Sequence, residues 1–346
     1  MSANSKIEWT DHTFNPWEGC QKVGPGCDHC YAETRNARFG GGKAVNWGPD
    51  APRRRTSAST WAQPERWNAQ AEAFAKQHGR RQRVFCASLA DVFDNVVPTA
   101  WRRDLFKLIA RTPNLDWMLL TKRIGNLDRM SFVDDDLMFH MLCERVWLGI
   151  TVCNQKEADR DIPKLQDAPA RLRFLSLEPL LGPVDLTKAL RTPHGPNWVI
   201  VGGESGTGAR PMHPDWARRL RDQCQAAGVP FHFKQHGQWL ATELRDGGRV
   251  GLRSYVSWLR ADGSVATELR GELGGVGRRS YVCWLRLDGS GHDGSDGVDF
   301  VGGDKEIILV GKKAAGRILD GRVWSEVPNL KPSDSSKEPR RDSSAP

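Results

Sequence analysis

The sequence has no long apolar run. None of its segments approaches the roughly 18 consecutive apolar residues that a membrane span requires. The opening residues, MSANSKIEWT, contain neither the basic segment nor the apolar segment of a secretory signal. We therefore expect a cytoplasmic protein without membrane contact. Thiols stay reduced in that compartment, so the eight cysteines are expected to act as ligands, reactive groups or core residues rather than to form disulfides.

Positive charge exceeds negative charge along the 346 residues, with a net charge of +8. Between Ala51 and Arg83 there are eight Lys or Arg and two Glu, a local net charge of +6. Such a stretch is typical of a solvated basic surface or of a nucleic-acid or phosphate contact, and the sequence leaves both open. The tryptophans leave a similar choice between base stacking and, more commonly, core packing. Among the fourteen are Trp9 and Trp17, which precede the basic stretch, and Trp61 and Trp67, which lie within it.

Apolar runs of strand length alternate with stretches of helical period. In TAWRRDLFKLIARTP, residues 99–113, the spacing of Trp101, Leu105, Leu108 and Ile109 predicts one buried helix face. Near-continuous apolar strands separated by helices indicate a parallel sheet that helices cover. Five or six such units predict an α/β fold, a partial (β/α) barrel of parallel strands. The runs are RVFCASLAD (83–91), LDWMLLTKR (115–123), RVWLGITVC (145–153), LRFLSLEPLLG (172–182), NWVIVGGESG (197–206) and PFHFKQHG (230–237).

Charged and hydroxyl residues recur where these strands end. In parallel α/β barrels the active site is built from loops at the carboxyl ends of the strands, so we expect these side chains to converge. For any one of them, a helix cap or a solvated loop is the alternative interpretation. The residues are Ser88, Asp91, Lys122, Arg123, Thr151, Glu178, Glu204, Ser205, Lys234 and Gln235.

The chain changes character after Gly237. The segments SYVSWLRADGS (254–264) and SYVCWLRLDGS (280–290) agree at nine of eleven positions, and their Asp-Gly pairs predict β-hairpins. We interpret this duplication as a decorative insertion. The expected organisation is a barrel domain over 1–240, a small β-rich duplicated insertion over 241–291, a flexible loop over 292–304, a closing segment over 305–328 and a disordered tail over 329–346.

The stretch GCQKVGPGCDHCYAE, residues 19–33, places Cys20, Cys27 and Cys30 around a glycine–proline turn. Thiolates hold both zinc and iron–sulfur clusters. Structural zinc usually takes four ligands, so His12, His29 or a distant cysteine would have to complete such a site. Three thiolates on a four-iron cluster would instead leave one iron open to a substrate. A zinc-stabilised, non-catalytic nucleic-acid-binding protein therefore stands as the alternative to an enzyme, and three unliganded thiols are a further reading.

Several motifs together carry a family resemblance. They are KIEWTDHTFNPWEGCQKVGPGCDHCYAE, LTKR, FLSLEPLLGPVDL, WVIVGGESGTGARPMHPDWARRLRDQCQAAGVPFHFKQHG and VGKKAAGRILDGR. Over roughly residues 6 to 237 and 305 to 328 the chain resembles the phage-type Gp37/Gp68 family of uncharacterised proteins (DUF5131), which is similar to radical S-adenosylmethionine enzymes.

This resemblance implies a radical-SAM-like partial barrel with a [4Fe–4S] cluster on Cys20, Cys27 and Cys30. S-adenosyl-L-methionine would chelate the open iron, and one electron would cleave it to methionine and a 5′-deoxyadenosyl radical that abstracts hydrogen from a substrate. An external one-electron donor of flavodoxin or ferredoxin type is implied. The substrate is unspecified, with nucleic acid or nucleotide as a candidate class, and a partner protein is left open.

The resemblance and the chemistry together assign expected roles. Gly202, Gly203, Glu204 and Ser205 are candidates for the cofactor's polar groups. Lys122, Arg123 and Lys234 would hold an anionic substrate or the cofactor carboxylate. Asp91 and Glu178 would bind ribose hydroxyls or act as acid and base, with an ion pair to a neighbouring Lys or Arg as the alternative for each.

Overall fold

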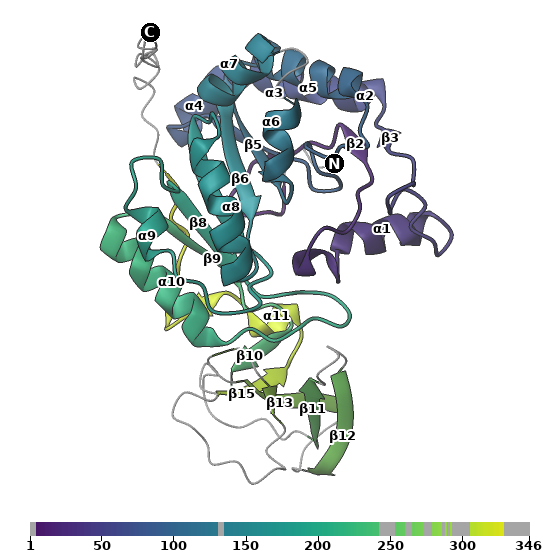
Figure 1. Ribbon diagram of the computed structural model, residues 1–346, viewed down its shortest axis with the longest axis vertical. Coiled ribbons are helices and arrows are strands. Elements are labelled where there is room, and N and C mark those ends of the chain that lie inside the picture. The colour runs from purple at the N-terminus through teal and green to yellow at the C-terminus, as the bar shows by residue number, and fades with distance from the viewer. Residues whose placement is uncertain are drawn as a thin grey trace.

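The computed structural model describes residues 5–130, 135–241, 253–259, 265–272, 279–285, 288, 291–292 and 305–328. Seven parallel strands form one sheet in the order β1-β4-β5-β6-β7-β8-β9, curled into a half-barrel (Figure 1). The predicted α/β partial barrel is thereby confirmed. The strands are β1 (His12–Thr13), β4 (Gln82–Cys86), β5 (Leu115–Thr121), β6 (Val146–Thr151), β7 (Leu172–Leu177), β8 (Trp198–Gly202) and β9 (Phe231–Gln235).

Helices cover the outer face of this sheet, and α4, α7, α8 and α10 pack directly against its strands. The α-helices are α1 (Tyr31–Phe39), α2 (Ala58–Trp61), α3 (Gln63–Ala69), α4 (Ala71–His78), α5 (Thr99–Arg111), α6 (Leu127–Met130), α7 (Asp135–Arg145), α8 (Gln155–Asp167), α9 (Thr187–Leu190), α10 (Pro214–Ala227) and α11 (Lys312–Ala315). Two 3-10 helices, η1 (Pro25–Cys27) and η2 (Ile124–Asn126), lie in connections.

Both faces of the sheet are buried, which explains the near-continuous apolar runs. Alternate strand residues such as Val84 and Leu119 face the helices, together with Leu105 and Leu108 of α5. The other residues of the strands form an aromatic cluster inside the curl, which includes Phe85, Met118, Trp147, Phe174 and Trp198. The half-barrel is therefore filled below its carboxyl edge.

The fit inside the curl is close. Gly149 of β6 lies opposite Phe174 of β7, and a β-carbon on Gly149 would collide with that ring. Of the four tryptophans named in the sequence analysis, Trp9, Trp17 and Trp67 are at most 5% exposed, so the core interpretation is confirmed for them. Trp61 remains partly exposed.

A second sheet follows the half-barrel, in the order β10-β15-β13-β11-β12 with β14 on β13. Its strands are β10 (Trp239–Ala241), β11 (Arg253–Leu259), β12 (Val265–Glu272), β13 (Arg279–Leu285), β14 (Gly291–His292) and β15 (Lys305–Leu309). The predicted hairpins are present, since β11 pairs antiparallel with β12 and β13 pairs antiparallel with β14. The two copies of the duplication also pair with each other, in parallel and in register. The loop expected over 292–304, apart from His292, and the tail expected over 329–346 lie outside the described residues.

Two small two-stranded ribbons complete the described elements. β2 (Trp17–Glu18) pairs antiparallel with β3 (Arg54–Arg55), and β16 (Ile318–Leu319) pairs antiparallel with β17 (Arg322–Val323). The chain after β17 runs beside β9, where the backbone N–H of Phe233 donates to Trp324 at 3.0 Å and that of Glu326 donates to Phe231 at 3.2 Å. No described helix combines the length and the apolar character needed to cross a membrane.

Candidate functional site

The three-cysteine loop begins directly after β2 and ends at α1. Gly24 precedes η1, which contains Cys27, and Cys30 is the residue before the first turn of α1. Cys27 is buried, whereas Cys20 and Cys30 are partly exposed, and all three are free thiols. The loop lies over the exits of the parallel strands, because residues that follow β5, β7 and β8 contact it.

Two cations at the exit of β5 lie against the loop. The guanidinium of Arg123 donates to the backbone carbonyl of Gln21 at 2.8 Å and to Cys20 Sγ at 3.4 Å. Lys122 Cε lies 3.4 Å from the position a β-carbon would take on Gly26. Burial lowers the pKa of Lys122, but the neighbouring sulfurs of Cys27, Cys153 and Cys30 outweigh it and leave that pKa raised.

The Cys20 thiol is held in its neutral form by its surroundings. Burial raises its pKa to about 11, and the negative charge of Asp91 acts in the same direction. The hydrogen bond from Arg123 opposes this effect. Forming a thiolate at Cys20 therefore requires a further positive charge, which a bound metal would supply.

Asp91, at the exit of β4, fixes the cation pair. Its carboxylate accepts hydrogen bonds from the backbone N–H of Phe93 at 2.9 Å, from the hydroxyl of Thr121 at 2.8 Å and from the backbone N–H of Lys122 at 3.0 Å. Arg123 Nε lies 3.8 Å from the same carboxylate. The structure therefore brings Asp91, Lys122 and Arg123 together, with both oxygens of Asp91 engaged.

A second set of contacts ties the loop to the exit of β8. Glu204 is 5% exposed and accepts hydrogen bonds from Arg210 through the backbone N–H at 2.8 Å, Nε at 2.9 Å and Nη2 at 2.6 Å. His29 Nδ1 donates to the same carboxylate at 3.0 Å. Arg210 also donates to the carbonyl of Pro25 at 2.8 Å and to Asp28 at 3.0 Å. We call Glu204, Arg210 and His29 the latch, because they join the cysteine loop to the sheet.

The charge of Glu204 is stabilised by the latch. Burial raises its pKa, but the hydrogen bonds from Arg210 and His29 outweigh burial and leave the pKa below its usual value. Sequence reasoning placed Glu204 at a cofactor and did not single out Arg210. The only available signal was an arginine six residues after an acidic strand exit, which is weak.

Glu178 and Lys234 form a separate pair at the exits of β7 and β9. Lys234 Nζ lies 2.6 and 2.7 Å from the two carboxylate oxygens of Glu178, and Gln235 Nε2 donates to one of them at 3.2 Å. Pro179, the next residue, lies 3.6 Å from the β-carbon position of Gly26, so this pair is near the cysteine loop. The side chains of Glu178 and Lys234 are 19% and 27% exposed, which leaves both open to solvent at the barrel mouth.

The two glycines at the end of β8, Gly202 within the strand and Gly203 after it, differ in what surrounds them. A β-carbon on Gly203 would overlap the backbone carbonyl of His236, so the exits of β8 and β9 approach closely only because this residue is glycine. A β-carbon on Gly202 would meet the Glu178 side chain at 3.5 Å, an ordinary contact. Ser205 makes no side-chain hydrogen bond to any described residue, and its predicted role stays untested.

The three thiols of the loop are side chains of a type that binds metals, although their sulfurs do not converge on one point. In the part of the chain that the structure describes, no three His, Cys, Asp or Glu side chains are arranged to hold a metal ion. His12 bonds to Gln82 through Nε2 at 2.6 Å and His29 bonds to Glu204 through Nδ1 at 3.0 Å, so one ring nitrogen of each suggested fourth ligand is engaged. Cys153, just after β6, instead lies against Gly26.

Comparison with known proteins gives a family. A family described as "Protein of unknown function (DUF5131)" matches residues 4–328. The chain belongs to this family. No curated protein matches it.

Solved structures give a distant likeness. The chain is similar to a double mutant of spore photoproduct lyase with bound AdoMet and dinucleoside spore photoproduct, at 12% identity, a TM-score of 0.35 and coverage of 77% of this chain and 70% of that chain. It is also similar to spore photoproduct lyase complexed with dinucleoside spore photoproduct, at 11% identity, a TM-score of 0.33 and the same coverage. TM-scores this low carry no argument about what the DUF5131 chain does.

Proposed function

We propose that this protein is a radical S-adenosylmethionine enzyme whose cluster is held by Cys20, Cys27 and Cys30. The observation that carries the proposal is the position of the three thiols, which share one loop over the carboxyl edge of a parallel half-barrel with two cations against them. In α/β barrels that edge is the catalytic one. The sulfurs would have to turn toward a common point when the cluster is loaded.

The chain's own residues would favour this loading. Lys122 and Arg123 place positive charge beside the sulfurs, which lowers the cost of the thiolate form. The latch anchors the loop at Pro25 and Asp28. A bound [4Fe–4S] cluster would supply one electron, from a flavodoxin or ferredoxin type of donor, for cleavage of S-adenosylmethionine to a 5′-deoxyadenosyl radical.

The pair of Glu178 and Lys234 would orient an anionic group at the mouth. Glu178 fixes the ammonium of Lys234 by contacts at 2.6 and 2.7 Å, while leaving it partly exposed. A carboxylate or phosphate of the cofactor or substrate would bind that ammonium by a charge-assisted hydrogen bond. The aromatic cluster inside the curl would exclude water from below.

Cys153 gives the zinc alternative a specific basis. The sequence spacing lacks a fourth conventional ligand, but Cys153 lies against Gly26, the residue before Cys27. A four-cysteine zinc site is thereby the second candidate, with a structural rather than a catalytic role.

The test is anaerobic purification and reconstitution, with iron and zinc quantified, followed by dithionite, S-adenosylmethionine and an assay for 5′-deoxyadenosine. We expect about four iron atoms per chain and formation of 5′-deoxyadenosine. Cys27→Ala should abolish both, whereas Cys143→Ala, which changes a partly exposed thiol in α7, should preserve both.

Cys153→Ser separates the two candidates. If Cys20, Cys27 and Cys30 alone hold a cluster, this variant retains its iron and its cleavage activity. Stoichiometric zinc in the parent protein, with loss of zinc in Cys153→Ser and no cofactor cleavage, would overturn the enzyme proposal in favour of a four-cysteine structural site.

A further inference from the structure

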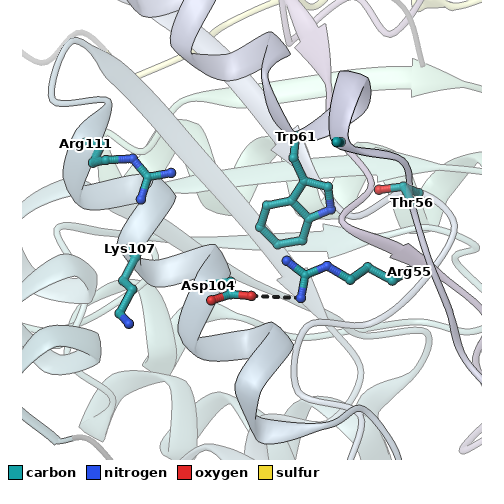
Figure 2. Close-up of a pocket in the computed structure, with 7 residues that line it drawn as sticks. Arg55, Thr56, Trp61, Asp104, Lys107 and Arg111 are labelled. Atoms are coloured by element: carbon teal, nitrogen blue, oxygen red, sulfur yellow. Dashed lines mark ion pairs between the residues drawn. The ribbon is translucent and has the colours of Figure 1, made fainter.

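A basic hollow lies outside the cysteine site, between β3, α2 and α5 (Figure 2). It has a volume of about 360 Å³, within the usual size range of ligand pockets. Three of its lining residues are cations, Arg55, Lys107 and Arg111, and one is an acid, Asp104. We call it the Arg55 pocket.

Most of the basic stretch identified in the sequence does not contribute to this pocket. Arg53 is buried and pairs with Asp94 at 2.8 Å, and Arg80 pairs with Asp11 at 2.7 Å. Arg55 is the cation of that stretch that lines the pocket, and the other two lining cations come from α5. The pocket is therefore a local assembly from distant segments.

Carboxylates hold the two guanidinium groups while leaving donors unused. Arg55 Nη1 pairs with Asp104 at 2.8 Å, as Figure 2 shows, and Arg111 Nε pairs with Glu65 at 2.9 Å. Each guanidinium has five N–H donors, so such a pair orients it without saturating it. Lys107 is exposed and has no ion pair or hydrogen bond within the described chain. The pocket thus presents oriented donors and one uncompensated positive charge.

Trp61 adds an aromatic wall with an unused donor. Its ring contacts Phe14 edge to face at 5.7 Å between centroids, and the Arg55 guanidinium carbon lies 4.3 Å from its centroid. The indole N–H is buried and has no acceptor among the described residues. A buried donor without a partner indicates a missing acceptor, such as a water or a ligand atom.

We propose that the Arg55 pocket binds the phosphodiester backbone of single-stranded nucleic acid. Cations interleaved with an aromatic side chain are the elements by which proteins track single strands. Lys107 and Arg111 follow at a four-residue step on one face of α5, about 6 Å apart along the axis, so together with Arg55 they extend the positive charge beyond a single phosphate. A hollow of this size admits one nucleotide unit.

The pocket is connected to the cysteine loop through one strand pair. Arg55 lies opposite Trp17, and Arg54 lies opposite Glu18, two residues before Cys20. A strand bound at Arg55 would therefore lie beside the segment that enters the loop. The inference goes beyond the proposed function and does not depend on it, because binding is measurable whichever metal the loop holds.

The test compares two double variants of the full chain by fluorescence anisotropy with a labelled oligothymidylate at several salt concentrations. Lys107→Gln with Arg111→Gln removes two pocket cations. Lys188→Gln with Arg191→Gln removes two exposed cations at α9, which lies well away from α2 and α5 in Figure 1. Both variants change the net charge equally, so bulk electrostatics is matched.

We expect the pocket variant to bind the oligonucleotide at least about tenfold more weakly. The slope of the logarithm of the binding constant against the logarithm of the salt concentration should fall in magnitude by about 1.4, as expected for the loss of two single-strand phosphate contacts. The α9 variant should bind like the parent. Trp61→Phe, which keeps a ring but removes the N–H, should weaken binding a few-fold. The proposal would be overturned by equal weakening in both double variants. It would also be overturned if inorganic tripolyphosphate competed as strongly as unlabelled oligonucleotide, or if duplex DNA bound more tightly than the single strand.

Discussion

Glu204 is the residue at which the expected and the observed surroundings differ most. It follows two glycines at the end of β8, which is why it was assigned to a cofactor, yet its carboxylate accepts four hydrogen bonds within the latch. A carboxylate so fully engaged acts on the site by positioning the cysteine loop. This role makes the latch testable through stability as well as through activity.

Glu204→Gln keeps the shape of the side chain and removes its charge. We expect the free energy of unfolding at pH 7 to fall by about 2 kcal/mol, because charge-assisted hydrogen bonds to Arg210 are lost. The pKa of Glu204 is lowered by folding from 4.5, so its contribution is present above that value and is lost as pH falls through the folded pKa.

The measurement is urea unfolding of the parent and the variant at several pH values between 7 and 3. The difference between them should be largest near neutrality and should shrink in acid. Asp50→Asn, at an exposed carboxylate without a partner among the described residues, is the control and should show almost no difference at any pH. A difference for Glu204→Gln that stays constant with pH would show that its charge is not what the latch uses.

The latch also shows what local sequence can and cannot predict about the site. The apolar runs predicted where the strands end. Five site residues were therefore correctly placed after strands or near their ends: Asp91, Lys122, Glu178, Glu204 and Lys234. The side chains that these residues contact could not be predicted from the sequence. His29 lies 175 positions from Glu204 and Arg210 comes from an irregular loop, so only the folded chain brings them together.

At the scale of elements, the junction of β8 and β9 depends on one glycine of a pair. Gly203→Ala should lower the free energy of unfolding by at least about 2 kcal/mol, because its β-carbon would overlap the His236 carbonyl and force the two strand exits apart. Gly202→Ala, the adjacent change, should cost less than about 1 kcal/mol, since its β-carbon meets only an ordinary contact.

Denaturant unfolding of the two variants decides this prediction, and 5′-deoxyadenosine formation adds a second readout. Equal losses of stability would mean that the junction is soft enough to absorb a methyl group. If Gly202→Ala is stable but impaired in S-adenosylmethionine cleavage, the proposed approach of the cofactor to this turn gains support.

Helix and strand positions were predictable where one periodicity dominated. In α5 the expected buried face is present, with Leu105, Leu108 and Ile109 fully buried and Trp101 partly buried. The parallel pairing of β11 with β13 was not predictable, because two copies with nearly the same side-chain alternation fit the same neighbours equally well. The duplication therefore predicted hairpins correctly but not how the copies pair.

At the scale of the whole molecule, the chain runs from β9 of the seven-stranded sheet directly into β10 of the second large sheet, where β10 pairs with β15. These strands run antiparallel, with Trp239 opposite Leu309 and Ala241 opposite Ile307. Trp239 also anchors the junction to the half-barrel, since its indole donates to the carbonyl of Ala209 at 2.5 Å, and Ile307 is fully buried. The duplicated segment begins after β10 and ends before β15, so it connects two paired strands. This is the connection expected of an insertion.

Replacing residues 242–306 by Asn-Gly should leave the half-barrel intact. The two residues would join Ala241 and Ile307 as a tight turn, for which Asn-Gly is the preferred pair. We expect the melting temperature to change by less than about 3 °C, the shift that roughly 1 kcal/mol produces in a large domain. Metal content and 5′-deoxyadenosine formation should match those of the parent, because the cysteine loop, the latch and the pair of Glu178 and Lys234 all lie outside the replaced segment. A chain that ends at residue 328 serves as the control for shortening as such.

Loss of cofactor cleavage with an unchanged melting temperature would contradict the decorative interpretation and assign the duplicated segment to substrate or partner binding. Loss of folding would instead show that β13 is part of the core, because β13 pairs with β15.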